Sequence, residues 1–328
     1  MHRPIFYTIV LIACFLFLGN IQLKAQQDAQ FSQYMFNQLY LNPGSAGANA
    51  QQIEFNVIHR SQWLGYQGSF DDGGAPTTQI ASISMPLEKY NLGIGLHLVN
   101  DRIGPVTNQE IQLSAAYKLK VSKGIISIGL RGGLYNQLLN VDELRFTDQA
   151  REPLLQGLDG RESQMVPDFA AGIYFKDINN KFFSGIAVNH LNRSDFNYGT
   201  NISINELKSH FNFLVGLNLD LTRNVTVTPS AIVKSDMNTF SIESSVIATF
   251  NDKFYTGISM REVEAAIALV GVNLLKDNSL RVGYAFDYTL KARNAKETTS
   301  HEILLSYRLP ALQMFTPSII RTPRFRHE

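Results

Sequence analysis

The feature that most constrains this chain is an alternation of apolar and polar residues with a period of two, which recurs from about residue 50 to residue 309. Residues 111–119, 211–219 and 303–309 show it cleanly. Successive side chains of a β-strand point to opposite faces, so this period predicts strands with one apolar and one polar face. We expect about fourteen, covering roughly residues 53–60, 78–86, 91–99, 109–119, 125–135, 168–176, 181–190, 210–219, 225–234, 239–249, 253–260, 265–273, 279–288 and 301–309.

The connections between these strands alternate in length. Short turns rich in Asn, Asp, Gly and Lys follow every second strand, whereas longer loops are expected at 61–77, 100–108, 136–167, 191–209 and 289–300. Short turns at one end and long loops at the other are typical of a bacterial outer-membrane β-barrel, and several strands are long enough to cross a bilayer. The sequence therefore predicts an all-β fold, a transmembrane antiparallel barrel of about 14 strands. The alternative is a soluble sandwich or propeller.

The composition fits such a barrel. Charged residues make up only 17% of the chain, against about 25% in typical globular domains. We expect the small and polar face of the strands to point into the barrel and the apolar face to meet outer-membrane lipid. Lys and Arg number 29 and Asp and Glu 28, so no basic excess indicates a nucleic-acid partner.

The N-terminus has the pattern of a signal peptide. His2 and Arg3 precede an apolar run over residues 5–18, and cleavage is expected near Ala25. A lipobox ending at Cys14 is the rival interpretation. Cys14 is the only cysteine, so the mature chain would have none. The predicted organisation is a signal peptide (1–25), an N-terminal periplasmic or plug segment (26–52), the barrel (53–309) and a C-terminal periplasmic tail (310–328). An even number of strands would place both termini in the periplasm.

The sequence lacks the common motifs of catalysis. His301-Glu302 is not followed by the second histidine of a zinc protease motif, and there is no nucleophile elbow, P-loop or complete dinucleotide fingerprint. The seven histidines are scattered singly. We therefore predict no catalytic residue, no metal ligand and no cofactor, and hence a protein that is not an enzyme.

Residues 27–47 read QDAQFSQYMFNQLYLNPGSAG, and this segment resembles the opening of the PorP/SprF family of type IX secretion system membrane proteins of Bacteroidetes. Ala29 stands where that family usually has Pro, and residues 67–73 lengthen a link that is usually tighter. Further matches in chain order are 60–65, 74–79, 101–105, 167–175, 283–290 and 300–303. The family-motif residues expected in partner contacts or in a plug are Phe31, Ser32, Gln33, Tyr34, Asn42, Pro43, Gly47, Arg60, Gln62, Trp63, Pro76, Asp101, Gly104, Pro105, Asp287 and Tyr288.

The resemblance implies a non-enzymatic outer-membrane component that assists export or surface attachment of secreted proteins or gliding adhesins with a C-terminal sorting domain. It implies two kinds of protein partner: periplasmic type IX lipoproteins or peptidoglycan-linked components, and the secreted substrate itself. A channel or transporter for small or hydrophobic solutes is the alternative, and a barrel enzyme such as a lipase or protease is a third. The basic, proline-broken tail is either a docking segment or disordered.

Overall fold

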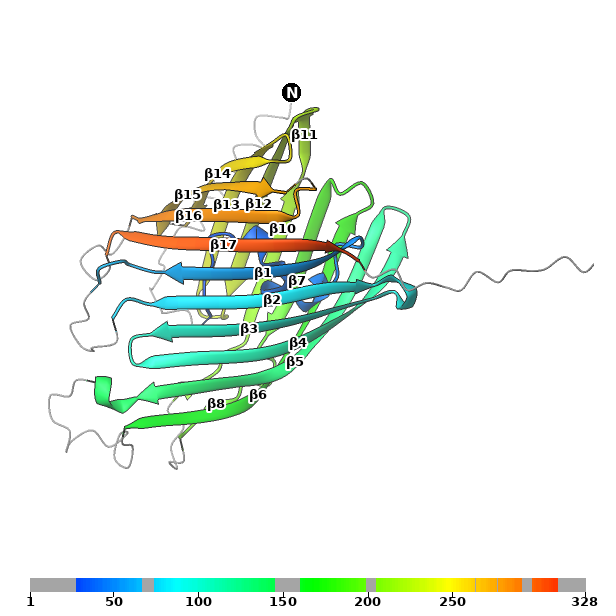
Figure 1. The fold of residues 1–328 in the computed structure, drawn as a ribbon. Coiled ribbons are helices and arrows are strands. Elements are labelled where there is room, and N and C mark those ends of the chain that lie inside the picture. The colour runs from blue at the N-terminus through cyan, green and yellow to red at the C-terminus, as the bar shows by residue number, and fades with distance from the viewer. Residues whose placement is uncertain are drawn as a thin grey trace, which may run out of the picture.

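Fourteen antiparallel strands close into a barrel in the computed structural model, which describes residues 28–66, 74–144, 160–198, 205–262, 264–275, 277–290 and 297–311 (Figure 1). They are built from fifteen segments: β1 (Gln52–Ser61), β2 (Thr77–Leu87), β3 (Leu92–Ile103), β4 (Val106–Val121), β5 (Gly124–Asn140), β6 (Arg161–Asp177), β7 (Phe182–Asn189), β10 (His210–Leu217), β11 (Leu219–Thr222), β12 (Val225–Ser235), β13 (Phe240–Phe250), β14 (Phe254–Arg261), β15 (Ala265–Leu274), β16 (Leu280–Thr289) and β17 (Thr299–Pro310). The predicted signal peptide and residues 312–328 of the predicted tail lie outside the described residues.

Each strand pairs with its neighbours in the sequence, and the barrel closes where β1 meets β17 in the register Gln52↔Pro310 to Ser61↔His301. β10 and β11 both pair with β12 and form one barrel strand interrupted at Asn218, so the fifteen segments make fourteen barrel strands. Closure satisfies the backbone groups that an open sheet would expose to lipid. The predicted barrel and its strand number are confirmed.

Two predicted loops differ from the structure. The prediction of a long loop at 100–108 is wrong, because β3 and β4 are joined by the two-residue turn Gly104-Pro105, in which Gly104 has a φ of +57°. The predicted loop 136–167 is shorter than expected, since β5 runs on to Asn140 and β6 already begins at Arg161. The short 3-10 turn η4 (Val141–Glu143) follows β5, and the hairpin of β8 (Asp195–Phe196) with β9 (Asn205–Glu206) covers the same end.

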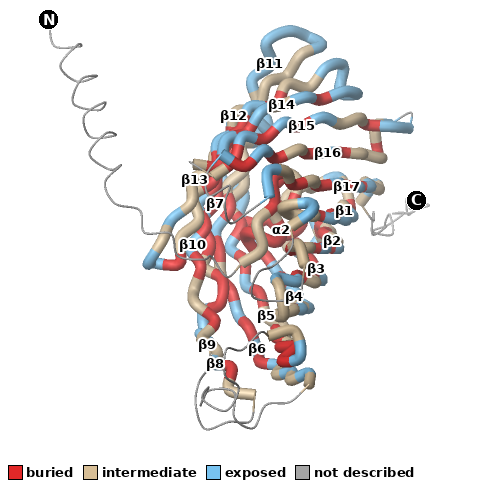
Figure 2. The backbone as a smooth tube through the Cα atoms, turned by 90° about the vertical axis from the view of Figure 1, so that its left-hand side faces the viewer, coloured by how far each residue is buried: buried red, intermediate tan, exposed pale blue. Residues whose placement is uncertain are grey.

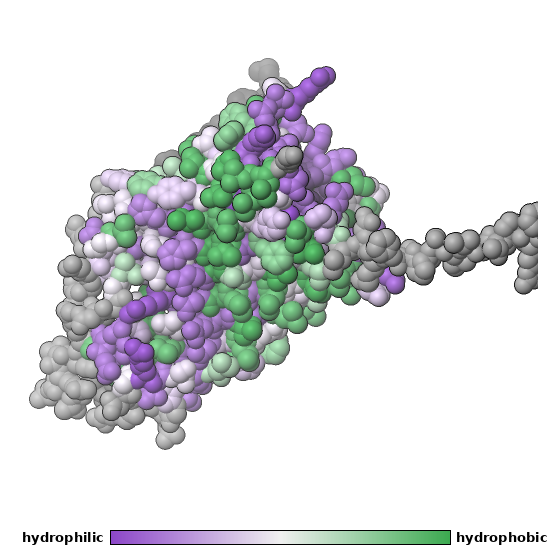
Figure 3. Space-filling model, viewed as in Figure 1, coloured by the Kyte–Doolittle hydropathy of each residue, from purple (hydrophilic) through white to green (hydrophobic). Residues whose placement is uncertain are grey.

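The two faces of the strands separate as the alternation predicts. Leu113, Leu130 and Ile258 are exposed on the outer face. The side of the barrel seen in Figure 3 carries an apolar belt between more polar ends. Polar side chains such as Gln112 and Glu243 are buried on the inner face. Among the described residues, no helix is long and apolar enough to cross a membrane.

The inner face is not only small and polar, which corrects that part of the expectation. Ile58, Ile80, Ile232, Leu269 and Leu304 point inward and are fully buried in one apolar cluster. These side chains need an apolar partner inside the barrel, and the residues that precede β1 provide it.

Candidate functional site within the barrel

The residues before β1 lie inside the barrel and fill part of its lumen (Figure 2). This lumen segment, residues 28–51, contains η1 (Tyr34–Phe36), the single-turn helix α2 (Gln38–Leu41) and η2 (Pro43–Ser45). Its first described residue, Asp28, contacts His190 and His210, at the ends of β7 and β10 that lead into the long loop between them. The segment leads into β1 at Gln52, at the short-turn rim. The prediction that this segment starts on the short-turn side is therefore wrong for the described residues.

Aromatic side chains anchor the lumen segment. Phe31 and Tyr34 are each only 1% exposed and belong to the cluster that includes Ile58 and Leu304 of the barrel wall. The Phe31 and Tyr40 rings meet edge to face with centroids 5.4 Å apart. Full burial of one such large side chain contributes roughly 1.5–3 kcal/mol, so these contacts make the segment part of the barrel core.

A buried charge cluster holds the start of the segment to β1, β16 and β17. Arg60 donates to Asp287 Oδ2 at 2.7 Å and to Glu302 Oε2 at 3.2 Å, and its Nη1 donates to Ser32 Oγ at 2.6 Å. The backbone N–H groups of Ser32 and Gln33 donate to the two oxygens of Glu302 at 2.7 and 2.9 Å. Ser32 Oγ also donates to Asp287 at 2.7 Å. The segment thus completes hydrogen bonding that these buried carboxylates require.

A second ion pair extends this charge cluster. Arg261 Nε donates to Glu243 Oε2 at 2.9 Å, and Arg261 Nη2 donates to Ser32 Oγ at 3.2 Å. Beside it, Tyr34 Oη lies 2.9 Å from both Ser230 Oγ and Ser245 Oγ. Side chains from several strands of the barrel wall therefore hydrogen-bond to the lumen segment.

Further polar contacts fix the second half of the segment. Asn42 Nδ2 donates to the backbone oxygens of Ile173 and Ile186 at 2.9 and 3.3 Å, and its Oδ1 accepts from Gly44 N at 2.8 Å. The last carbonyls of α2 are met by barrel side chains. The Arg131 guanidinium donates to the oxygens of Leu39 and Tyr40, and Asn212 Nδ2 donates to Leu41 O at 3.0 Å. Helix ends buried away from water need such partners.

Glycines in the barrel wall make room for η2. A Cβ on Gly129 would lie 2.3 Å from Gly44 N and 2.4 Å from Pro43 C, and one on Gly172 would lie 2.2 Å from Asn42 Oδ1. The absence of side chains here lets the backbone of the segment press against the sheet.

We expect Gly129→Ala to destabilise the folded barrel by about 1–3 kcal/mol, because its Cβ would meet backbone atoms that cannot turn away. Gly132→Ala in the same strand is the matched control, since its nearest contact would be an ordinary 3.5 Å to the Phe169 ring. The control should change stability by less than about 0.5 kcal/mol. Urea titrations read as the folded fraction on unheated gels measure both, and equal midpoints for the two variants would contradict the close fit.

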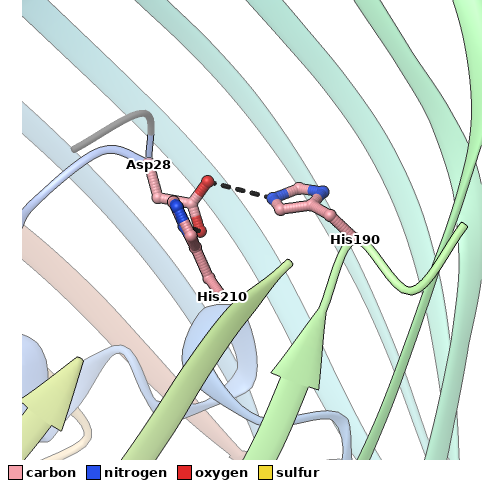
Figure 4. Close-up of side chains that lie close together, drawn as sticks. All are labelled: Asp28, His190 and His210. Atoms are coloured by element: carbon pink, nitrogen blue, oxygen red, sulfur yellow. Dashed lines mark hydrogen bonds and ion pairs between the residues drawn. The ribbon is translucent and has the colours of Figure 1, made fainter. Parts of the chain in front are cut away.

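Two histidines that are isolated in the sequence meet in a further buried cluster, which was not predicted. Asp28 Oδ1 lies 2.9 Å from His190 Nε2, and Asp28 Oδ2 lies 2.5 Å from His210 Nδ1 (Figure 4). His190 Nδ1 lies 2.9 Å from Asp168 Oδ1. The two histidines are twenty positions apart, but β7 and β10 are neighbours and pair in the register His210↔Asn189. The proximity of the two histidines therefore follows from the order of the strands in the sheet.

The electrostatics of this cluster favour paired charges. Burial alone would raise the pKa of Asp28, but His210 and His190 outweigh it and hold that pKa well below its usual range. Burial alone would lower the pKa of His190, but Asp28 and Asp168 raise it well above its usual value. In the absence of another cation, the carboxylates and a protonated His190 therefore stabilise one another.

The remaining family-motif residues do not join the segment. Gln62 N donates to Pro76 O at 2.9 Å, and Trp63 N donates to Ser300 Oγ at 3.1 Å, at the loop end of β1. Four others are distributed over the wall. Asp101 accepts from Thr78 Oγ1 at 2.5 Å, Gly104 and Pro105 form the β3–β4 turn, and Tyr288 is exposed on the outer face. Gly47, in contrast, follows η2 with a φ of +62° against Met85 and Pro86. Roles in partner contacts stay predictions for all of these residues.

Below the lumen segment, on the short-turn side, lies a cavity of about 600 Å³. Phe36 and Arg281 border it, with the guanidinium of Arg281 4.2 Å from the centre of the Phe36 ring. Lys176, Arg308 and Glu54 add charged groups to its lining. The lumen is therefore hollow toward the short turns, whereas the segment occupies it above.

These features define the class of protein: an outer-membrane β-barrel whose lumen is occupied by its own N-terminal segment. The family model described as type IX secretion system membrane protein PorP/SprF matches residues 23–307, and the chain belongs to this family. The predicted resemblance is confirmed. No curated protein sequence matches the chain.

A solved structure supports the fold. A mutant of TodX, a monoaromatic hydrocarbon channel, superimposes with a TM-score of 0.50 at 11% identity, covering 82% of this chain and 93% of that chain. CymD, also a monoaromatic hydrocarbon channel, gives a TM-score of 0.48 at 12% identity over 87% of this chain and 94% of its own. The toluene transporter TodX of P. putida gives 0.47 at 8% identity over 83% and 93%. At such identities the likeness concerns the barrel alone.

Proposed function

We propose that this protein is a non-enzymatic outer-membrane component of type IX secretion that assists export or surface attachment of proteins bearing a C-terminal sorting domain. Membership of the family supports the secretion role. The lumen segment is the observation that favours such a tether for secreted proteins over a solute channel. Its buried aromatic side chains and its contacts to Arg60 and Glu302 occupy the passage through the barrel.

In this proposal the short-turn rim faces the periplasm, as in other outer-membrane barrels. Periplasmic type IX lipoproteins or peptidoglycan-linked components meet the barrel there, and the secreted protein is held by the long loops at the other end. The barrel then acts as a rigid platform, and the chemistry of export is left to other components.

A mild-detergent pull-down of the tagged protein, analysed by mass spectrometry, tests the proposal. We expect to recover a sorting-domain protein or periplasmic type IX lipoproteins, and we expect a deletion strain to lose surface display of the same sorting-domain protein. Recovery of neither, together with an unchanged secretome in the deletion strain, would refute the tether.

A solute channel is the second candidate, because the cavity of about 600 Å³ opens the lumen on the short-turn side. Steady openings of the wild-type barrel in planar bilayers would favour it, whereas the tether proposal expects a closed barrel.

A further inference from the structure

Three side chains with metal-binding atoms meet where the lumen segment begins. One potential ligand atom each of Asp28, His190 and His210 lies within 4.8 Å of the other two. Figure 4 shows the Asp28 carboxylate between the two imidazole rings. The rings stand at 77° to each other with centroids 5.8 Å apart, so their nitrogens approach the carboxylate from different directions.

The surroundings of His190 match those of a metal-binding histidine. Its second nitrogen, Nδ1, lies 2.9 Å from Asp168 Oδ1, and the other oxygen of Asp168 accepts from Gln112 Nε2 at 2.7 Å. A carboxylate on the far nitrogen fixes the tautomer and the ring orientation of histidines that bind metals. The His190 ring also forms a T-shaped contact with the Tyr135 ring, with an interplanar angle of 88° and centroids 5.7 Å apart, which limits its rotation.

The cluster is nearly closed to solvent. The side chains of Asp28, His190 and His210 are 16%, 4% and 7% exposed. With neutral imidazoles, the carboxylates of Asp28 and Asp168 carry two buried negative charges, which a divalent cation neutralises. Two imidazole nitrogens with one carboxylate oxygen form a ligand set that suits zinc and related first-row metals, with one position left for water.

We propose that Asp28, His190 and His210 bind one divalent first-row transition-metal ion, such as zinc, which fastens the N-terminal segment to the barrel wall. Asp28 comes from the segment, whereas the histidines come from the loop-side ends of β7 and β10. The metal binds the imidazole nitrogens in their deprotonated form, so it takes the place of the proton between His190 and Asp28. Asp168 is a positioning residue, which acts through His190.

The test uses the full-length barrel, isolated from its outer membrane in mild detergent through an affinity tag without histidines. After removal of metal with a chelator, zinc is titrated calorimetrically and cobalt is added for its visible spectrum. We expect one ion per chain and a cobalt spectrum of nitrogen and oxygen ligands. His210→Gln and Asp28→Asn should abolish this saturable binding, and Asp168→Asn should weaken it about 10–100-fold.

His59→Gln is the matched control, because His59 is exposed on the outer face of β1 and should not contribute to binding. Migration on unheated gels shows whether each variant folds. A folded wild-type barrel without saturable zinc binding would overturn the proposal, and so would equal binding by His210→Gln and His59→Gln. The first of these results would identify the cluster as a hydrogen-bonded ion pair only.

Discussion

Replacing Arg60 by Met should lower the free energy of unfolding of the barrel by about 3–5 kcal/mol. Arg60 is 2% exposed and pairs with Asp287 and Glu302, which are equally buried. Without it, the guanidinium of Arg261 remains in the cluster, where it pairs with Glu243 at 2.9 Å and lies 3.7 Å from Asp287. Glu302 then loses the ion pair that Arg60 provides. Methionine retains an unbranched apolar chain of similar shape but no charge, so the buried carboxylate of Glu302 is left uncompensated and that of Asp287 only partly compensated. Urea titration of the folded fraction on unheated gels measures the loss.

Arg102→Met is the matched control for this substitution. Arg102 also pairs with a glutamate, Glu143, at 3.0 Å, but its side chain is 44% exposed. Exposed pairs contribute about 0–1 kcal/mol, because water screens them and holding the side chains still costs entropy. Similar urea midpoints for the Arg60 and Arg102 variants would show that burial of the Arg60 cluster is not what stabilises the barrel.

The barrel itself was predictable because two local signals agree. The period of two identifies strands, and the alternation of short turns with long loops identifies a closed up-and-down arrangement. The ends of strands were less predictable. Residues 100–103 and 136–140 are largely polar and read as loop, but they continue β3 and β5 as paired strand. Polarity alone does not distinguish a solvated strand from a loop.

The candidate site was predictable only in part. The motif residues Ser32, Gln33, Arg60 and Asp287 do meet, and closure of the first strand on the last explains why Glu302 joins them. The course of the segment was not predictable, since short single turns leave no period in a sequence. His190 and His210 were missed because their proximity depends on the pairing of β7 with β10, and on Asp28 reaching that end of the lumen.

Removal of residues 28–48 should convert a closed barrel into a conducting one. The deleted stretch carries Phe31, Tyr34 and Tyr40, which are almost completely buried within the lumen. Their loss would join the cavity of about 600 Å³ on the short-turn side to the loop-side end. We expect single-channel recordings in planar bilayers to change from a closed baseline to steady openings. Only preparations whose heat-dependent gel migration shows a folded barrel enter the comparison.

Deletion of residues 67–73 is the control for this experiment, because it shortens the connection between β1 and β2 and leaves the described contacts of the lumen segment in place. This variant should stay closed. If the folded barrel without residues 28–48 also stays closed, side chains of the wall seal the lumen and the segment serves another purpose. If the wild-type barrel already conducts steadily, the segment does not block the passage, and a solute channel is favoured over a tether.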